Sequence, residues 1–229
     1  MIETLINEIP RFFTASNVSF LAAAAGRTLL LSLAGCLIGG AIGFILVCIR
    51  QTRSAWLAPL RVTAIAYTEI FRRIPFLVIL FLVLFAIQVV APTASLFTIA
   101  LTGVCIVATA FLSEIIRAGF ESVHREQIEA AEVMNFSRMQ VIFMVMAPQA
   151  WKVILPPAFA FMVMFVKDTA LASQIGVVEL TFTGKILSNR GFSATLTFGV
   201  ILLLYFALSY PLTRLGRYLE KRLAAPRHR

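Results

Sequence analysis

Charged residues are scarce in this sequence, and their scarcity sets the class of protein. Asp, Glu, Lys and Arg make up 14% of the 229 residues, whereas apolar types make up 60%. A soluble domain of this length needs far more charge to cover its surface. With a mean hydropathy of +0.91, the composition excludes a soluble globular domain and predicts an integral membrane protein.

Acidic residues are especially few, with 11 Asp and Glu against 20 Lys and Arg, which gives a net charge of +9. A basic balance of this size is also seen in proteins that bind nucleic acid, but no RNA- or DNA-binding motif occurs in the sequence. Lys and Arg gather in the cytoplasmic loops of membrane proteins. We therefore expect membrane lipid, and not nucleic acid, around these charges.

Residues and motifs of metal sites and catalysis are also sparse. The three cysteines, Cys36, Cys48 and Cys105, lie in apolar runs without paired spacing, and His124 and His228 lie in basic segments without ligand-like neighbours. We expect no metal and no catalytic residue. The sequence has no Walker-type glycine loop, so the chain does not hydrolyse ATP by itself. It has no G-x-S-x-G or H-E-x-x-H motif either, so a membrane protease is unsupported.

The N-terminal segment, residues 1–25, does not have the pattern of a cleavable signal. Its first residues carry Glu3 and Glu8 in place of a basic start, and the first long apolar run comes later. Ile2, Leu5 and Ile6 begin an apolar pattern at helical spacing. We expect a short helix lying at the membrane interface.

Five apolar stretches are long enough, or nearly so, to cross a membrane as helices. A span needs about 20 residues for a hydrocarbon core of ~30 Å. We place spans at about 28–49, 76–91, 97–116, a fourth that ends beyond Lys167, and 195–212. The basic residues of the first connection, the third connection and the C-terminal tail predict that these parts are cytoplasmic. The N-terminus then lies outside.

The first predicted span has a stripe of small residues. Gly35, Gly39 and Gly43 recur every four residues, so one face of the helix is smooth and allows close packing. The stripe fits either a seam between two copies or packing within the subunit.

Two acidic residues near the inner ends of spans have arginines at helical spacing. Glu69 has Arg72 and Arg73 three and four residues on, and Glu114 has Arg117 three residues on. Local ion pairs are the simplest interpretation. For Glu114 an alternative stays open, in which its carboxylate faces a transport pathway.

The fourth span carries ionisable groups. If its membrane portion begins near Pro156 and Pro157, the helix rises only about 15 Å before Lys167 and Asp168, which places them near the middle of the membrane. Charges at that depth are costly and tend to face water or a substrate path. Alternatively the span begins near Gln149, and the two charges mark its outer end.

The polar connection between the third and fourth spans, residues 121–149, is here called the coupling segment. Within it, the pattern of residues 127–134 predicts a short helix with Ile128, Ala131 and Met134 on one face. Ala130 and Ala131 are small, so another backbone can approach them closely, and Glu129 adds a fixed charge. Asn135 tolerates the left-handed backbone of a helix C-cap. The pattern fits docking into a groove of another protein or, alternatively, a solvated helix without a partner.

Several motifs, in order, resemble a known family. The coupling segment contains Glu129-Ala130-Ala131, Asn135 and Ala147-Pro148, which resemble the EAA loop of ABC importer permeases. Motifs typical of the polar amino-acid branch are Tyr67-Thr68-Glu69-Ile70-Phe71-Arg72-Arg73-Ile74-Pro75, Ser113-Glu114-Ile115-Ile116-Arg117, Leu155-Pro156-Pro157, Lys167-Asp168-Thr169-Ala170-Leu171 and Ile175-Gly176-Val177-Val178-Glu179-Leu180. The resemblance extends from about Gly26 to about Arg217.

The resemblance implies a type I ABC importer fold with about five spans, a permease domain over 26–217 and a basic cytoplasmic tail over 218–229. It implies a multi-pass protein of a bacterial inner membrane that imports a polar amino acid. The implied partners are two ABC ATPase subunits that bind the ATP, a second permease subunit, identical or paralogous, and a periplasmic or lipoprotein amino-acid-binding protein. The residues that then contact the ATPase are Glu129, Ala130, Ala131 and Asn135. For the substrate we expect Lys167, Asp168, Thr169 and Glu114: Asp168 accepts the ammonium group or a cationic side chain, Thr169 forms a hydrogen bond, and Lys167 meets a carboxylate or pairs with Asp168 or Glu114.

The sequence departs from the family pattern in the coupling segment. The family usually has Gly at the position of Asn135 and Leu-Pro at Ala147-Pro148, and Pro and Gly are common at His124 and Glu126. Without these helix breakers we expect a more continuous helix entering the coupling segment than is usual in the family.

Two other functions stay open on the residues alone. A self-contained channel or secondary transporter would be active in liposomes as a single polypeptide, whereas an importer permease needs an ATPase. A structural membrane subunit would tolerate a charge reversal at Glu129.

Overall fold

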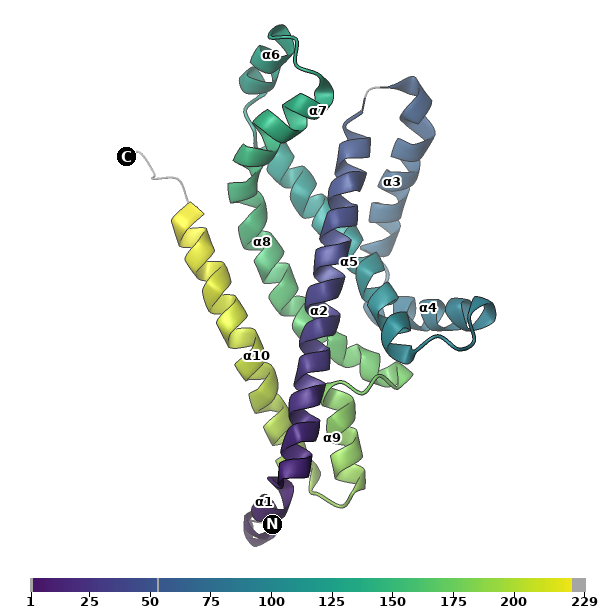
Figure 1. Ribbon diagram of the computed structural model, residues 1–229, viewed down its shortest axis with the longest axis vertical. Coiled ribbons are helices and arrows are strands. Elements are labelled where there is room, and N and C mark those ends of the chain that lie inside the picture. Colours follow the sequence, from purple (N-terminus) through teal and green to yellow (C-terminus); the bar gives the residue numbers. More distant parts are fainter. Residues whose placement is uncertain (1, 53, 224–229) are drawn as a thin grey trace. The chain divides into compact units, whose positions relative to one another are not determined.

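The computed structural model describes residues 2–52 and 54–223, with the backbone alone for residues 2–6. Helices account for its regular structure, and no strand occurs within these ranges, as expected for an all-α protein (Figure 1). The elements, where η marks a 3-10 or π helix, are α1 (Ile2–Phe12), α2 (Ala15–Arg50), η1 (Ala55–Leu57), α3 (Ala58–Phe71), α4 (Phe76–Val90), α5 (Leu96–Glu121), α6 (Arg125–Val133), α7 (Arg138–Gln140), η2 (Val141–Met146), α8 (Ala147–Asp168), η3 (Thr169–Ile175), α9 (Leu180–Asn189) and α10 (Ala194–Leu223).

The number of helices that could cross a membrane agrees with the predicted number of spans. Four helical runs of the described chain are long and apolar enough to cross a membrane: Ala15–Arg50, Leu96–Glu121, Arg138–Ile175 and Ala194–Leu223. The pair Ala55–Phe71 and Phe76–Val90, with a short break between them, adds a fifth if the two count as one span. The orientation of the termini stays a prediction.

Two predicted spans differ in detail. α4 has 15 residues and rises about 22 Å, so it is too short to be the whole second span, contrary to the prediction for 76–91. Pro156 and Pro157 lie inside α8, which begins at Ala147. The helix therefore begins before the prolines, but where its membrane portion begins, near the prolines or near Gln149, stays a prediction. The depth of Lys167 and Asp168 in the membrane stays a prediction.

The chain divides into two compact units. Unit 1 comprises the described residues up to Gly35, Phe76–Val104 and Val163–Leu212. Its apolar core joins α1, α2, α9 and α10 through Phe12, Leu21, Leu187 and Ile201. The helix predicted at the N-terminus is present as α1, and the Glu8 carboxylate accepts a hydrogen bond from the Ser193 N–H at 2.9 Å. Its location at the membrane interface stays a prediction.

Unit 2 comprises Cys36–Pro75, Cys105–Met162 and the described residues from Thr213 on. Within it two glycines of the α2 stripe, Gly39 and Gly43, pack against α5. A Cβ on Gly39 would lie 2.6 Å from Ala108 Cβ and 2.8 Å from the Thr109 nitrogen, and one on Gly43 would lie 3.0 Å from the Ser113 nitrogen. These positions therefore require glycine for close approach of two backbones, and the stripe serves packing within the subunit.

Candidate functional site

The coupling segment begins at a break in the chain, because α5 ends at Glu121 and α6 starts at Arg125. The helix is therefore interrupted where the coupling segment begins, and the predicted comparison, a more continuous helix than is usual in the family, stays a prediction. Val123 is only 8% exposed and packs in the core of unit 2 with Val47 and Phe120. His124 then has an extended backbone (φ −57°, ψ 129°) at the start of α6. Burial of Val123 turns the chain without a proline or glycine.

The far end of α6 is closed by a Schellman turn. Asn135 has φ +65°, the left-handed conformation. Its N–H donates to the Glu132 carbonyl at 3.0 Å, and the Phe136 N–H donates to the Ala131 carbonyl at 3.1 Å. These two bonds satisfy carbonyls that a helix end otherwise leaves unpaired. The predicted role of Asn135 at the C-terminal end of the helix is confirmed.

α6 has one buried anchor and a broad exposed surface. Ala131 is 5% exposed and packs against the core of unit 2, with Ile128 partly buried beside it. Met134 was expected on the same face but is 69% exposed, because the helix ends at Val133 and the Schellman turn redirects the chain. Val133 is 87% exposed, so the exposed surface at this end of α6 carries apolar side chains as well as the Glu129 carboxylate. Exposed apolar surface of this kind is typical of interaction sites.

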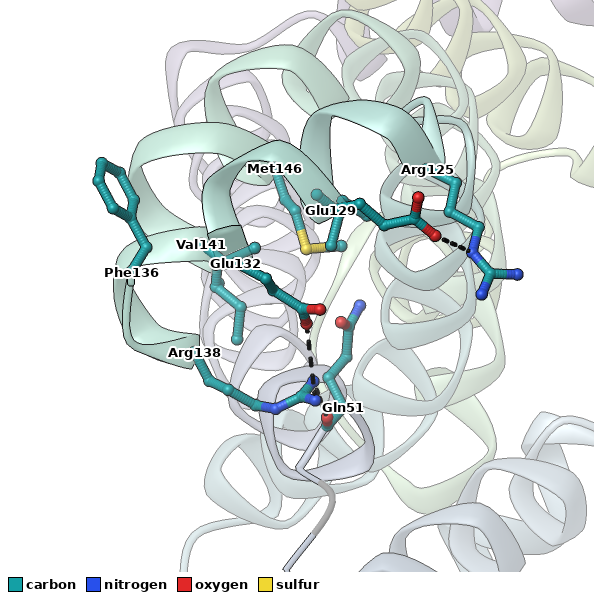
Figure 2. A pocket seen from close by; sticks show the side chains of 10 residues that line it. Gln51, Arg125, Glu129, Glu132, Phe136, Arg138, Val141 and Met146 are labelled. Atoms are coloured by element: carbon teal, nitrogen blue, oxygen red, sulfur yellow. Dashed lines mark hydrogen bonds and ion pairs between the residues drawn. The ribbon is translucent and has the colours of Figure 1, made fainter. Parts of the chain in front are cut away.

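A pocket of about 670 Å³ lies beside α6 (Figure 2). Charged and apolar side chains line it together: Arg125, Glu129, Glu132 and Arg138, with Gln51, on the polar side, and Ile128, Phe136, Val141, Ile142 and Met146 on the apolar side. Arg125 Nε donates to Glu129 Oε1 at 2.8 Å, and Arg138 Nη2 lies 3.8 Å from Glu132 Oε1. A hollow lined by both charged and apolar side chains can receive a side chain or loop of a partner protein.

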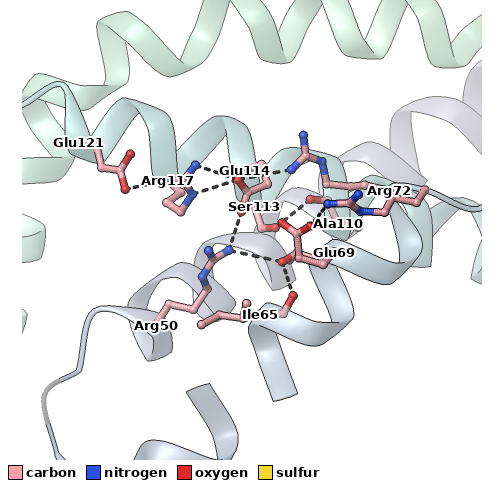
Figure 3. Close-up of polar contacts among 11 residues, drawn as sticks. Arg50, Ile65, Glu69, Arg72, Ala110, Ser113, Glu114, Arg117 and Glu121 are labelled. Atoms are coloured by element: carbon pink, nitrogen blue, oxygen red, sulfur yellow. Dashed lines mark hydrogen bonds and ion pairs between the residues drawn. The ribbon is translucent and has the colours of Figure 1, made fainter. Parts of the chain in front are cut away.

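Glu114 lies at the centre of a second polar cluster in unit 2 (Figure 3). Arg50 Nη1 donates to Glu114 Oε1 at 2.6 Å, and Arg117 Nε donates to Oε2 at 2.9 Å. Arg72 Nη1 lies 3.4 Å from Oε2. The predicted Glu114–Arg117 pair is therefore present but is part of a larger cluster, here called the Glu114 cluster, that joins α2, the C-terminal end of α3, and α5.

Sequence spacing left the partner of Glu69 undecided, and the structure assigns it to Arg73, four residues on. Arg72 instead contacts Glu114 and lies over the Phe111 ring, with 5.8 Å from its guanidinium carbon to the ring centroid. Sequence reasoning missed Arg50 and Arg72 as partners of Glu114. The only sequence signal was that both lie near the ends of apolar runs.

The other residues proposed to contact substrate lie in unit 1, at the junction of α8 and η3. Lys167 is exposed, Asp168 is half-buried and Thr169 is buried. Thr169 Oγ1 donates to the Val166 carbonyl at 2.7 Å, so its hydroxyl proton is used within the helix. Among the ion pairs of the described residues, none joins Lys167 to Asp168. Lys185 Nζ lies 3.3 Å from Ser173 Oγ on η3, a contact that sequence reasoning missed.

Glu179 is a further residue of unit 1 whose role the sequence did not predict. Its side chain is fully buried. Oε1 accepts from the Phe182 N–H at 2.8 Å, and Oε2 accepts from the Tyr205 hydroxyl at 2.7 Å. Burial raises the pKa of this carboxyl. Glu179 therefore caps α9 and ties it to α10.

Comparison with known proteins gives a consistent picture. Residues 54–225 match the family of binding-protein-dependent transport system inner membrane components. The probable glutamine ABC transporter permease protein GlnP of Bacillus subtilis (strain 168) is 34% identical over 157 residues, which cover 67% of this chain and 72% of the relative. The probable amino-acid ABC transporter permease protein YckA of the same organism is 32% identical over 199 residues, which cover 87% of each chain.

Two solved structures are similar in fold. A chain from the crystal structure of an amino acid ABC transporter with histidines matches with a TM-score of 0.81 at 26% identity, over 90% of this chain and 95% of that one. A chain of the MetNI methionine ABC transporter in an inward-facing conformation matches with a TM-score of 0.79 at 22% identity, over 93% and 100% of the two chains. At that identity the second likeness concerns the fold alone.

Proposed function

Because this chain belongs to the family of binding-protein-dependent transport system inner membrane components, we propose that a separate ATPase subunit drives it through the coupling segment. The chain is the membrane-spanning permease of an amino-acid ABC importer. It has the type I importer transmembrane fold and is a multi-pass protein of the bacterial inner membrane.

The exposed surface of α6 is the observation that carries the proposal. Val133 and Met134 are 87% and 69% exposed beside the Glu129 carboxylate, while Ala131 fixes the helix to the core of unit 2. An ATP-driven switch needs such an element, rigid on one side and accessible on the other. Glu129, Ala130 and Asn135 are all exposed, and they contact the ATPase in this proposal.

The complete importer contains two ATPase subunits, which bind and hydrolyse ATP, and a second permease subunit. A periplasmic or lipoprotein binding protein delivers the substrate. Closure of the ATPase pair on ATP moves α6, and the buried contacts of Ala131 and Val123 carry that motion into α5 and α8. The permease itself supplies no group for hydrolysis.

The first test reverses the charge of Glu129. In the reconstituted transporter we expect Glu129→Arg to weaken ATPase binding by about 2 kcal/mol, roughly thirtyfold, and to abolish ATP-driven uptake while the variant still folds. Glu220→Arg is the matched control, since Glu220 is also exposed but lies outside the coupling segment. Normal ATPase binding and uptake in Glu129→Arg would reject the proposed contact. Uptake by the permease alone would indicate a self-contained transporter.

We further propose that the substrate is a polar amino acid whose ammonium group is bound by Asp168, with Lys167 and Thr169 beside it. Curated relatives are named for glutamine, glutamate and L-cystine transport. Asp168 is the only aspartate of the sequence and lies half-buried where α8 gives way to η3. Glu114 is a weaker candidate for this site, because three arginines already surround its carboxylate.

The second test is Asp168→Asn, which keeps the side-chain shape but removes the charge. We expect uptake of the amino acid and substrate-stimulated ATP hydrolysis to fall at least about tenfold, since a charged hydrogen bond is worth about 1.5–3 kcal/mol. ATPase binding should stay unchanged, which separates this effect from that of Glu129→Arg. Unchanged uptake would remove Asp168 from the substrate site.

A further inference from the structure

The last part of α10 carries a basic surface that the transport mechanism above does not use. α10 is a single helix of 30 residues, Ala194–Leu223 (Figure 1). From Ala194 to Leu212 it rises about 28 Å, close to the ~30 Å of a hydrocarbon core. If the helix crosses the membrane along this stretch, the residues that follow lie at the level of the lipid headgroups.

Basic side chains in this part of α10 fall on one face. Arg214, Arg217 and Lys221 are spaced by three and four residues, so they lie above one another on the helix. They surround a hollow of about 540 Å³ together with Leu215 and Tyr218. All five residues are exposed. We call this surface, Arg214, Leu215, Arg217, Tyr218 and Lys221, the α10 basic face.

The α10 basic face points away from the rest of unit 2. A Cβ added to Gly216 would lie 3.2 Å from Phe159 Cβ of α8, so the Gly216 side of α10 packs against α8. At about 100° per residue, Gly216 lies on the opposite side of the helix from Arg214 and Lys221. The basic side chains therefore face outward, toward whatever surrounds the permease.

This face also combines apolar and charged side chains, as is typical of protein surfaces at the level of the lipid headgroups. Tyr218 is 50% exposed and Leu215 is 46% exposed, and the Arg222 guanidinium carbon lies 5.0 Å from the centroid of the Tyr218 ring. Tyrosine favours the boundary between hydrocarbon and water, because its ring is apolar and its hydroxyl is polar. Arg and Lys bury their methylene stems there and direct their charges toward phosphates.

We propose that the α10 basic face binds the headgroup phosphate of an anionic phospholipid, such as phosphatidylglycerol. The guanidinium of Arg217 and the ammonium of Lys221 pair with the phosphate, and Leu215 and Tyr218 contact the glycerol and the first acyl carbons. A cluster of positive charges at the inner end of a span attracts anionic lipid, by roughly fivefold in binding constant for each basic residue. The occupant is thus a lipid, and the attraction is independent of which amino acid is imported.

The test uses the complete transporter, purified with its ATPase and titrated in detergent with phosphatidylglycerol or phosphatidylcholine while bound lipid is counted by native mass spectrometry. We expect Arg217→Gln/Lys221→Gln to weaken phosphatidylglycerol binding by roughly fivefold for each charge removed. Arg217→Lys/Lys221→Arg keeps both charges and should bind like wild type. Lys152→Gln/Arg190→Gln removes two charges from exposed sites outside the face and should have little effect.

Three results would overturn the proposal. The first is unchanged phosphatidylglycerol binding by Arg217→Gln/Lys221→Gln, or a loss no larger than that of Lys152→Gln/Arg190→Gln. The second is equal binding of phosphatidylcholine and phosphatidylglycerol by wild type. The third is loss of the ATPase from the variant while lipid remains bound, which would assign the face to ATPase contact. Equal elution volume and equal thermal unfolding of all variants show that the comparison is between folded proteins.

Discussion

Glu114 and Glu129 belong to the same unit, and each pairs with arginine, yet their surroundings differ. The Glu114 side chain is 13% exposed and lies between Arg50, Arg72 and Arg117 from three parts of the chain. The Glu129 side chain is 57% exposed, and its partner Arg125, 88% exposed, lies four residues away on the same helix. One carboxylate therefore links elements of the fold, and the other is available to a second protein.

The comparison teaches that a motif match does not by itself tell these roles apart. Both residues belong to motifs that resemble the same permease family, and both were candidates for function. The two residues differ in their exposure and in whether their arginine partners come from distant or neighbouring positions in the chain. Contacts between distant segments stabilise the fold, whereas a local ion pair on an exposed helix contributes little to stability. Substitutions at the two kinds of site therefore test this distinction.

Replacing Glu114 should cost the most stability. In Glu114→Gln the three arginines lose the carboxylate that they share and repel one another. We expect a loss of about 2–3 kcal/mol and a lower Tm of the purified permease. Glu129→Gln is the matched control and should unfold like wild type. Equal losses in the two variants would show that the two sites do not differ in the way proposed.

Asn135 sets the geometry of the exposed helix, so its replacement should have an intermediate effect. Asn135→Ala must hold alanine at φ +65°, which costs about 1 kcal/mol, whereas Asn135→Gly should be neutral or slightly stabilising. The measurement is the Tm of each variant, together with ATPase affinity. A drop in Tm for Asn135→Gly equal to that for Asn135→Ala would contradict the role of the left-handed backbone.

Arg72 and Arg73 offer a smaller, internal test, because they are neighbours in the chain. Arg72→Gln removes one of three partners of Glu114, and we expect a loss of about 0.5–1 kcal/mol. Arg73→Gln breaks only the exposed pair with Glu69 and should leave the Tm unchanged. A larger drop in Tm for Arg73→Gln than for Arg72→Gln would indicate that contact with Glu114 does not determine how much these arginines stabilise the fold.

Much of the helical organisation follows from the sequence. Long apolar runs predicted the long helices of the described residues, because only helices and closed barrels satisfy their backbone in lipid. Asn135 was predicted to end its helix for a local reason, its tolerance of a left-handed backbone. Such predictions succeed because the cause lies within a few residues of the effect.

The features that the sequence did not predict have causes that are distant in sequence. The break before α6 depends on burial of Val123 against Val47 and Phe120, and no breaker residue marks it. Arg50 and Glu114 are 64 residues apart, so spacing could not pair them. Met134 was placed on the face of Ala131 by counting through a helix that ends one residue earlier. The depth of Asp168 and the identity of the substrate stay predictions, because they depend on the membrane and on partners, which helical periodicity does not encode.

The π-helical stretch Val141–Met146, between the coupling segment and α8, has a consequence for how related chains align. A π turn holds one residue more than an α turn. Each residue after it therefore lies about 100° around the helix axis from the position that it would have if the same sequence formed a straight α-helix. Losing one residue from this stretch would let it close as an α-helix without disturbing either flank. We expect single-residue deletions to be tolerated better here than anywhere in α5 or α8, and gaps in alignments with relatives to fall at this place.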